Sequence, residues 1–268
     1  MNRIDQRFAD LRTRGRRALI PFITAGDPGV DATVPVMHAL VRAGADLIEL
    51  GVPFSDPMAD GPVIQLSSER ALGRKVGLRT VLDYAREFRR QDTATPIVLM
   101  GYLNPVELCG LERFARDAAD AGVDGVLLVD CPPEEAADVR TALVARGLHQ
   151  ILLAAPTSDG ERVRRLLSDT GGYLYYVSFA GVTGAARLEL DAVRERVTGM
   201  KRESATPVAV GFGVRDADSA RAIAAFADAV VIGSALVQTL ADSADAGTAA
   251  RRAEDFLLPI RAALDSPP

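Results

Sequence analysis

The chain has 268 residues, 48% of them hydrophobic, and a formal net charge of −5. This length suits one large domain covering residues 1–268, because no shift in composition marks a boundary. The acidic balance argues against a nucleic-acid or polybasic membrane interface, and no apolar run is long enough to span a bilayer. We expect a cytoplasmic protein, because the first residues lack a signal-peptide core and Cys109 and Cys131 are typical of reduced thiols.

Histidine and lysine are scarce, which limits the possible catalytic chemistry. His38 and His149 are the only histidines, and Lys75 and Lys201 are the only lysines. This count excludes a histidine-rich metal site, so no metal is expected, and neither histidine has a serine or cysteine nucleophile beside it in the pattern. Schiff-base chemistry favours a lysine at the end of a strand, and neither lysine lies there. Carboxylates therefore remain the main candidates for acid/base catalysis.

Eight short apolar runs alternate with helical patterns along the chain. Val, Ile and Leu dominate these runs without clean alternation, which is typical of parallel strands buried on both faces. The runs cover residues 19–23, 47–51, 97–100, 126–129, 151–154, 173–178, 208–211 and 230–233. Helical periodicity is found over 31–43, 78–90, 111–121, 134–146, 161–168, 217–226 and 249–263.

This alternation predicts an α/β fold, a single (β/α)₈ TIM barrel. The alternative, an open doubly wound sheet, needs a glycine-rich turn after the first strand, and residues 24–29 do not form that fingerprint. Ile4, Phe8 and Leu11 share one helical face, so we expect an extra amino-terminal helix covering the bottom of the barrel.

A short internal repeat supports the assignment of repeated units. In three segments a predicted helix ends, an aspartate follows, and a predicted strand begins. These aspartates are Asp46, Asp124 and Asp228. Because these aspartates precede strands, they belong at the bottom of a barrel, where residues serve stability rather than catalysis.

The second apolar run carries the most informative residue of the chain. Glu49 lies inside this run, and Asp60 lies on the Pro/Gly-rich loop that follows. A glutamate is almost never buried without a partner or a role, and two carboxyl groups in different environments can divide acid and base work between them. The structural alternative is a Glu49 paired with an arginine and an Asp60 that makes a turn.

Glycine-rich segments follow the last two strands. Residues 211–213 and 233–234 each precede a helix, and the commonest phosphate site of a barrel uses these two loops. Residues 181–184, after strand six, form a small-residue loop that is typical of a lid. Tyr102 and Tyr175, near strand ends, favour a pocket wall over plain core packing.

Several of these motifs together resemble one known family. Residues 47–65, which include Glu49 and Asp60, are similar to the signature of the tryptophan synthase alpha subunit. Residues 21–28, 100–105, 181–184 and 211–213 also resemble motifs of that family, so the similarity runs nearly end to end.

The resemblance implies a lyase that cleaves indole-3-glycerol phosphate to indole and glyceraldehyde 3-phosphate in tryptophan biosynthesis. It also implies an α₂β₂ complex in which a beta subunit, with the pyridoxal phosphate, receives the indole; this chain itself would need no cofactor. By the same resemblance, Glu49 is the general acid/base and Asp60 holds the indole N–H.

The resemblance assigns the remaining site residues in four groups. Tyr175 and Thr183 would support Asp60. The phosphate would lie against Gly184, Phe212, Gly213, Gly233 and Ser234. The indole would be flanked by Phe22, Tyr102, Leu127 and Leu153. The beta subunit would contact Pro53, Asp56, Pro57 and Asn104.

Three other functions share parts of this pattern. A stand-alone indole-3-glycerol phosphate lyase would use the same site and release free indole. A non-catalytic subunit that only activates its partner would have no need of Glu49 and Asp60. A different phosphate-binding barrel isomerase would need the same glycine loops.

Overall fold

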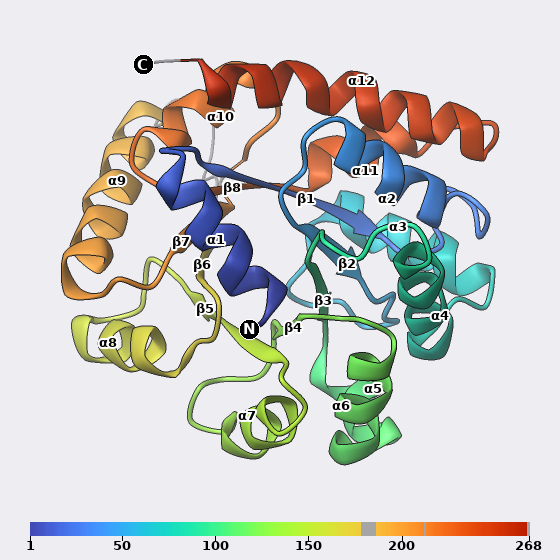
Figure 1. Ribbon diagram of the computed structural model, residues 1–268, viewed down its shortest axis with the longest axis horizontal. Helices are drawn as coiled ribbons and strands as arrows, with labels where there is room; N and C mark the ends of the chain where they lie inside the picture. The colour runs from blue at the N-terminus through green and yellow to red at the C-terminus, as the bar shows by residue number, and fades with distance from the viewer. Residues whose placement is uncertain (178–185, 212, 267–268) are drawn as a thin grey trace.

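Eight parallel strands close into a barrel in sequence order in the computed structural model, which describes residues 1–177, 186–211 and 213–266 (Figure 1). Each strand pairs with the next, and β8 returns to β1 through the pair Ala18 and Ala229. The strands are β1 (Ala18–Thr24), β2 (Ile48–Gly51), β3 (Ile97–Gly101), β4 (Gly125–Leu128), β5 (His149–Ala154), β6 (Leu174–Val177), β7 (Val208–Gly211) and β8 (Ala229–Ile232). The predicted TIM barrel is confirmed.

The helices form an outer layer around the strands (Figure 1). Those predicted from periodicity are present: α2 (Thr33–Arg42), α4 (Leu78–Arg89), α6 (Leu111–Asp120), α7 (Ala137–Val144), α8 (Gly160–Asp169), α10 (Ala217–Ala224) and α12 (Ala246–Asp265). The helix expected after Gly233 is α11 (Ser234–Leu240). Three further helices were not predicted: α3 (Pro62–Gly73), α5 (Leu103–Cys109) and α9 (Ala186–Glu203).

Side chains of the strands alternate between two cores. Those that point into the barrel, such as Ile20, Leu47 and Leu127, pack on one another, and those that point outward pack against the helices. Both sets are almost fully buried, which explains why the strand sequences are apolar without clean alternation. Among the described residues, no helix combines the length and apolar character needed to cross a membrane.

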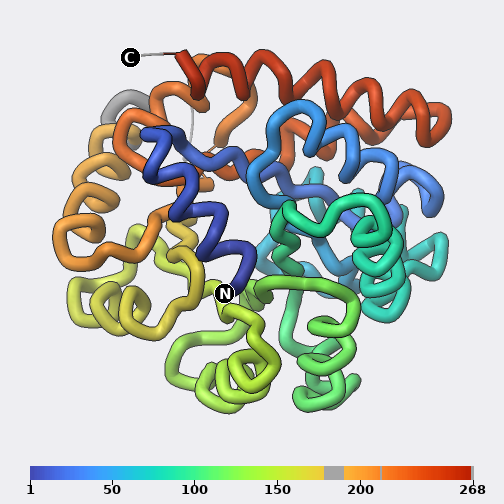
Figure 2. Tube along the Cα trace, in the orientation of Figure 1, coloured from blue at the N-terminus to red at the C-terminus, as the bar shows by residue number. Residues whose placement is uncertain are grey.

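The amino-terminal helix α1 (Arg3–Thr13) crosses one end of the barrel, as Figure 2 shows in dark blue. Its buried residues are Ile4, Phe8 and Leu11, and the Phe8 ring lies 5.7 Å from the ring of Tyr173. A Cβ added to Gly125, the first residue of β4, would lie 3.0 Å from Ile4. The helix therefore covers the amino-terminal ends of the strands, as predicted.

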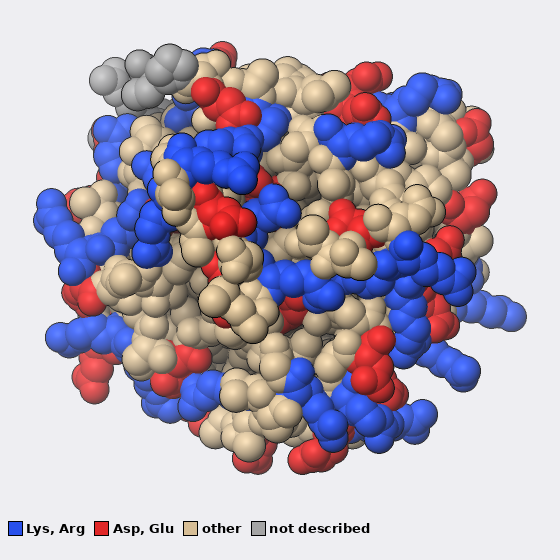
Figure 3. Space-filling view, in the orientation of Figure 1, with Lys and Arg blue, Asp and Glu red and all other residues tan. Residues whose placement is uncertain are grey.

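The three repeated aspartates lie at this same end. Each accepts a hydrogen bond from a backbone N–H at or near the start of the preceding strand, of Leu19, Ile97 or Val208, at 2.9–3.0 Å. Each also pairs with a cation at 2.7–3.0 Å: Asp46 with Arg261, Asp124 with Arg89, and Asp228 with Lys201. Basic and acidic side chains are interspersed over this face of the molecule (Figure 3).

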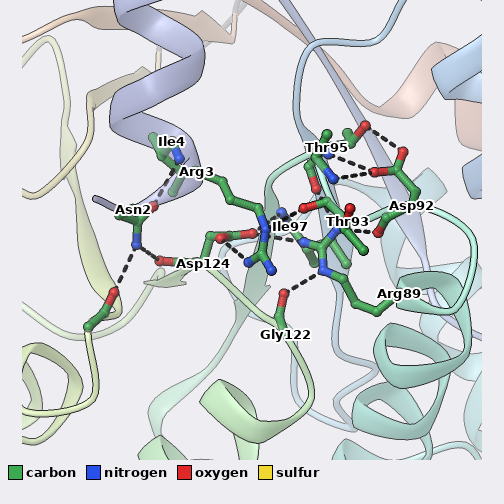
Figure 4. Close-up of polar contacts among 12 residues, drawn as sticks. Asn2, Arg3, Ile4, Arg89, Asp92, Thr93, Thr95, Ile97, Gly122 and Asp124 are labelled. Atoms are coloured by element: carbon green, nitrogen blue, oxygen red, sulfur yellow. Dashed lines mark hydrogen bonds and ion pairs between the residues drawn. The ribbon is translucent and has the colours of Figure 1, made fainter.

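Figure 4 shows the contacts of Asp124. Its carboxylate accepts from Arg3 at 2.7 Å, from Arg89 at 2.9 Å and from the backbone of Ile97 at 2.9 Å. The Asn2 side chain donates to the backbone carbonyl of Asp124 at 2.8 Å and so ties the start of α1 to the same point. The repeat marks a structural device at the bottom of the barrel, as expected.

Candidate active site at the carboxyl ends of the strands

Glu49 lies on β2 with its side chain inside the barrel and is fully buried. The Tyr173 hydroxyl donates to Glu49 Oε1 at 2.8 Å, and Oε2 has no hydrogen-bond partner among the described residues. Burial raises the pKa of Glu49 to about 7, against a smaller lowering by the Tyr173 hydrogen bond. No ion pair joins Glu49 to an arginine or lysine in the described part of the chain, so the structural alternative of an arginine-paired glutamate fails there.

Asp60 lies on the loop between β2 and α3. The Tyr102 hydroxyl donates to Asp60 Oδ2 at 3.1 Å and accepts from the backbone N–H of Ala59 at 3.0 Å. The Tyr102 ring stacks on Phe54, with the ring centres 4.9 Å apart. Burial raises the pKa of Asp60, and the Tyr102 hydrogen bond lowers it by less. The loop is thus held against the end of β3 by one tyrosine.

The charges of both carboxyl groups act on Tyr175, which lies on β6. Its pKa is raised first by burial and then by the charges of Glu49 and Asp60. A Cβ added to Gly211 would overlap the Tyr175 hydroxyl, which shows how closely this side chain approaches the end of β7.

Two tyrosines contact the carboxyl groups in ways that the sequence did not predict. The hydrogen bond to Asp60 comes from Tyr102, and none joins Tyr175 to Asp60 among the described residues. Tyr173, which holds Glu49, was not foreseen. Its position two residues before Tyr175 was the available signal, because residues two apart on a strand point to the same side.

A pocket opens at the carboxyl ends of β1 to β4. Phe22, Asp60 and Tyr102 line it together with Met100 and Ser68. The Phe22 ring lies beside Gly51 and Gly233, where an added Cβ would lie 2.6 Å and 3.6 Å from it. Phe22 and Tyr102 are therefore in the pocket wall, as expected.

The two predicted leucines are not among the residues that line this pocket. Leu127 is fully buried in the interior core, and the half-buried Leu153 packs against that core. Leu153 pairs with Tyr175 in the register of β5 and β6, which places the two residues side by side.

The glycine loops after β7 and β8 have different helix starts. Asp216 caps the first turn of α10 by accepting from the N–H of Ser219 at 2.9 Å, whereas α11 begins at Ser234, directly after Gly233, without a side-chain cap. Gly213 has φ of +48°, a conformation that favours glycine. The two predicted phosphate loops therefore differ in whether a side chain already occupies the first turn of the helix that follows. Thr183, Gly184 and Phe212 lie outside the described residues.

The four residues expected to face a partner subunit differ in exposure. Asp56 and Asn104 are exposed, Pro57 is half-buried and Pro53 is buried. Ser55 Oγ donates to Asp56 Oδ2 at 2.5 Å. Met58 and Leu108, which are near them in sequence, are 85% and 84% exposed, so this rim carries large apolar side chains in solvent.

Metal and disulfide chemistry have no site in the part of the chain that the structure describes. No group of three or more His, Cys, Asp or Glu side chains there is arranged to hold a metal ion. Cys109 and Cys131 are both free thiols, and burial raises the pKa of Cys131.

A family model and several known proteins match this chain along nearly its whole length. The family model described as "Tryptophan synthase alpha chain" matches residues 8–262. The tryptophan synthase alpha chain of Xanthomonas oryzae pv. oryzae (strain MAFF 311018) is 62% identical over 266 residues, 99% of each chain. That of Xylella fastidiosa (strain 9a5c) is 60% identical with the same coverage.

Solved structures agree with the sequence matches. Tryptophan synthase subunit alpha from Legionella pneumophila str. Paris superposes with a TM-score of 0.92 at 43% identity, over 99% of both chains. A tryptophan synthase structure from Mycobacterium tuberculosis gives a TM-score of 0.89 at 37% identity, again over 99% of both chains. The chain therefore belongs to the tryptophan synthase alpha chain family, and it is the lyase that cleaves indole-3-glycerol phosphate to indole and glyceraldehyde 3-phosphate in tryptophan biosynthesis.

Proposed function

We propose that Glu49 is the general acid/base of this cleavage and that Asp60 holds the indole N–H. The observation that carries this assignment is the state of Glu49: it is fully buried, one carboxyl oxygen has no hydrogen-bond partner among the described residues, and its pKa is about 7. A group with a pKa near the working pH can both give and take a proton, which is what this reaction requires.

The proposed steps use both carboxyl groups. Glu49 protonates C3 of the indole ring, and Asp60 accepts a hydrogen bond from the ring N–H and stabilises the indolenine cation. Glu49, now ionised, removes the proton of the side-chain hydroxyl next to C3. The bond from that carbon to C3 breaks, its electrons return to the ring to give indole, and the hydroxyl carbon becomes the aldehyde of glyceraldehyde 3-phosphate. The ring is the electron sink, so no lysine or cofactor of this chain is required.

The remaining substrate contacts follow from the pocket. We propose that Phe22, Tyr102, Leu127 and Leu153 flank the indole. The phosphate lies against Gly184, Phe212, Gly213, Gly233 and Ser234, and the uncapped first turn of α11 supports this placement. Tyr175 and Thr183 support Asp60; the proximity of Tyr175 to both carboxylates is consistent with this role.

We also propose that the chain works in the cytoplasm with a tryptophan synthase beta subunit in an α₂β₂ complex. The pyridoxal phosphate belongs to that partner. Pro53, Asp56, Pro57 and Asn104 are the proposed contacts, and the exposed Met58 and Leu108 supply apolar area near them in the chain.

Indole release by the purified chain, alone and with a beta subunit, tests the partnership. Acceleration by the partner is expected, because docking on the loop of Asp60 would help to order it. Fast release that the partner leaves unchanged would favour a stand-alone lyase.

The variant Glu49→Gln tests the assignment of the acid/base. It keeps the shape of the side chain and removes its proton chemistry, so we expect indole release to fall by at least about 10³-fold. Binding of glycerol 3-phosphate should stay within about tenfold of wild type, equal to about 1.4 kcal/mol. If ligand binding falls as far as the rate, Glu49 is a structural residue instead.

A further inference from the structure

Helix α3, which follows directly after Asp60, is attached to the barrel in an unusual way. Its buried residues are Ser67, Ser68 and Ala71, so it is the one helix of the described chain that buries no side chain larger than serine. Every other helix there buries at least one large apolar residue. Polar contacts, which are directional, therefore determine where α3 lies.

The amino-terminal end of α3 is bonded to the loop of Asp60. The Gln65 side chain donates to the backbone carbonyl of Asp60 at 2.8 Å and to that of Pro57 at 3.4 Å. Since Asp60 is only two residues before the first residue of α3, Pro62, these contacts make the loop and the helix one body. A movement of the helix consequently moves the Asp60 carboxyl group.

The rest of α3 is bonded to the end of β1 and the turn after it. Thr24 Oγ1 and Ser67 Oγ lie 2.6 Å apart, and Ser67 Oγ donates to the carbonyl of Ile64 at 2.8 Å. Arg70 forms a two-point contact with Asp27: Nε donates to Oδ1 at 2.7 Å and Nη2 donates to Oδ2 at 2.8 Å. The Asp27 side chain is 2% exposed and that of Arg70 is 34% exposed.

Because Arg70 lies well along α3 from Asp60, a small tilt of the helix at the Asp27 contact would displace the Asp60 carboxyl group. At 1.5 Å per residue, Arg70 lies about 12 Å along the helix from Pro62, so a tilt of about 5° moves the amino-terminal end by about 1 Å. A displacement of about 1 Å of a group that positions the substrate can lower a rate by about 10²-fold. A planar two-point contact fixes the orientation of both groups, which a single-point contact cannot do.

We propose that the Asp27–Arg70 ion pair is a positioning contact for the reaction: through α3 it sets the place of the Asp60 carboxyl group at the pocket. The proposal rests on the role of Asp60 proposed above. Neither Asp27 nor Arg70 lines the pocket, so each acts through another residue.

Arg70→Lys tests the proposal, because lysine keeps the charge and loses the two-point geometry. We expect the kcat of indole release to fall about tenfold or more, while the Kd of glycerol 3-phosphate, measured by calorimetry, stays within twofold. Arg70 does not attach α3 to the phosphate loops, so a displaced Asp60 should lower kcat and leave the Kd unchanged. A general loss of structure would instead lower kcat and weaken phosphate binding together. Ser67→Ala, which removes the contact with Thr24, should lower kcat about threefold with the same unchanged Kd.

Arg16→Lys is the matched control. Arg16 contacts Asp265 through the same Nε and Nη2 atoms, both at 2.9 Å, and is 35% exposed, but it lies just before the start of β1, at the end of that strand away from the pocket. Its kcat should stay within twofold of wild type. All assays are run below the unfolding midpoint of each variant.

Two results would overturn the proposal: Arg70→Lys and Ser67→Ala both keeping kcat within twofold of wild type, or kcat and phosphate affinity falling together. Asp60→Asn separates this failure from failure of the proposed function. If Asp60→Asn keeps full kcat, the assumed role of Asp60 is wrong; if it loses kcat and the α3 variants do not, only the positioning contact is wrong.

Discussion

At the amino-terminal ends of the strands, Asp46, Asp124 and Asp228 each lie against an arginine or a lysine. At the carboxyl ends, Glu49 and Asp60 lie against tyrosine hydroxyls. A cation neutralises a buried carboxylate, whereas a tyrosine supplies one hydrogen bond and no charge. One barrel therefore holds carboxyl groups with two kinds of partner, cations at the bottom and tyrosine hydroxyls at the carboxyl ends.

The difference follows from what the chain offers at each end. The bottom receives cations from helices, such as Arg89 at the end of α4 and Arg261 in α12. Glu49 is surrounded by the interior core, where Tyr173 and Tyr175 are the polar neighbours. A buried carboxyl group in such surroundings keeps its proton to higher pH, which suits an acid/base catalyst.

The largest expected effect comes from breaking a pair at the bottom. Asp124→Asn removes the charge that faces Arg89, whose side chain is 10% exposed, and weakens the link to Ile97. Removing one partner of a buried ion pair costs about 3–5 kcal/mol of the free energy of unfolding. Urea denaturation should show this loss, while the kcat of indole release at 25 °C stays within twofold.

Asp60→Asn is the comparison variant at the other end. The Asp60 side chain faces no cation among the described residues. The free energy of unfolding of this variant should therefore stay within about 1 kcal/mol of wild type while its kcat falls. The contrast between the two ends is wrong if Asp124→Asn slows the reaction in a folded protein or if Asp60→Asn unfolds the barrel.

Most of the fold could be predicted from the sequence, because its signal is local. Apolar runs separated by helical periodicity located all eight strands, and β7 was predicted with the bounds observed. Ile4, Phe8 and Leu11 share one face of α1 and are buried together, so periodicity alone predicted that helix. Helix α3 was missed because it buries serines, and a polar buried face gives no hydrophobic pattern to detect.

The site was predictable only in part. Glu49 could be recognised because a glutamate in an apolar strand is rare. The partners of the two carboxyl groups, Tyr173 and Tyr102, depend on contacts 124 and 42 residues away in sequence, which no local pattern contains. A strand tyrosine has the same sequence appearance whether it fills a core or holds a catalytic group. The cap of α10 by Asp216 was not predicted either, although an aspartate three residues before a serine at a helix start is a local cap signal.

The titration of Glu49 gives a smaller and sharper prediction. Its pKa is about 7 in the folded chain and about 4.5 ordinarily. Between these values the unfolded chain has released the proton that the folded chain still binds, so stability falls as pH rises from about 4.5 to about 7. This difference of about 2.5 in pKa corresponds to about 3 kcal/mol of the free energy of unfolding. Below and above this window, Glu49 contributes no pH dependence to the stability.

The variant Glu49→Gln isolates this contribution, because every other group titrates equally in both proteins. We expect the free energy of unfolding of the variant, minus that of wild type, to increase by about 3 kcal/mol between pH 4.5 and pH 7.5 in urea denaturation. A difference that stays constant over this range would mean that Glu49 is ionised at rest like an ordinary surface glutamate. The barrel would then have one kind of carboxyl group at both ends, and the proton for indole C3 would have to come from another residue.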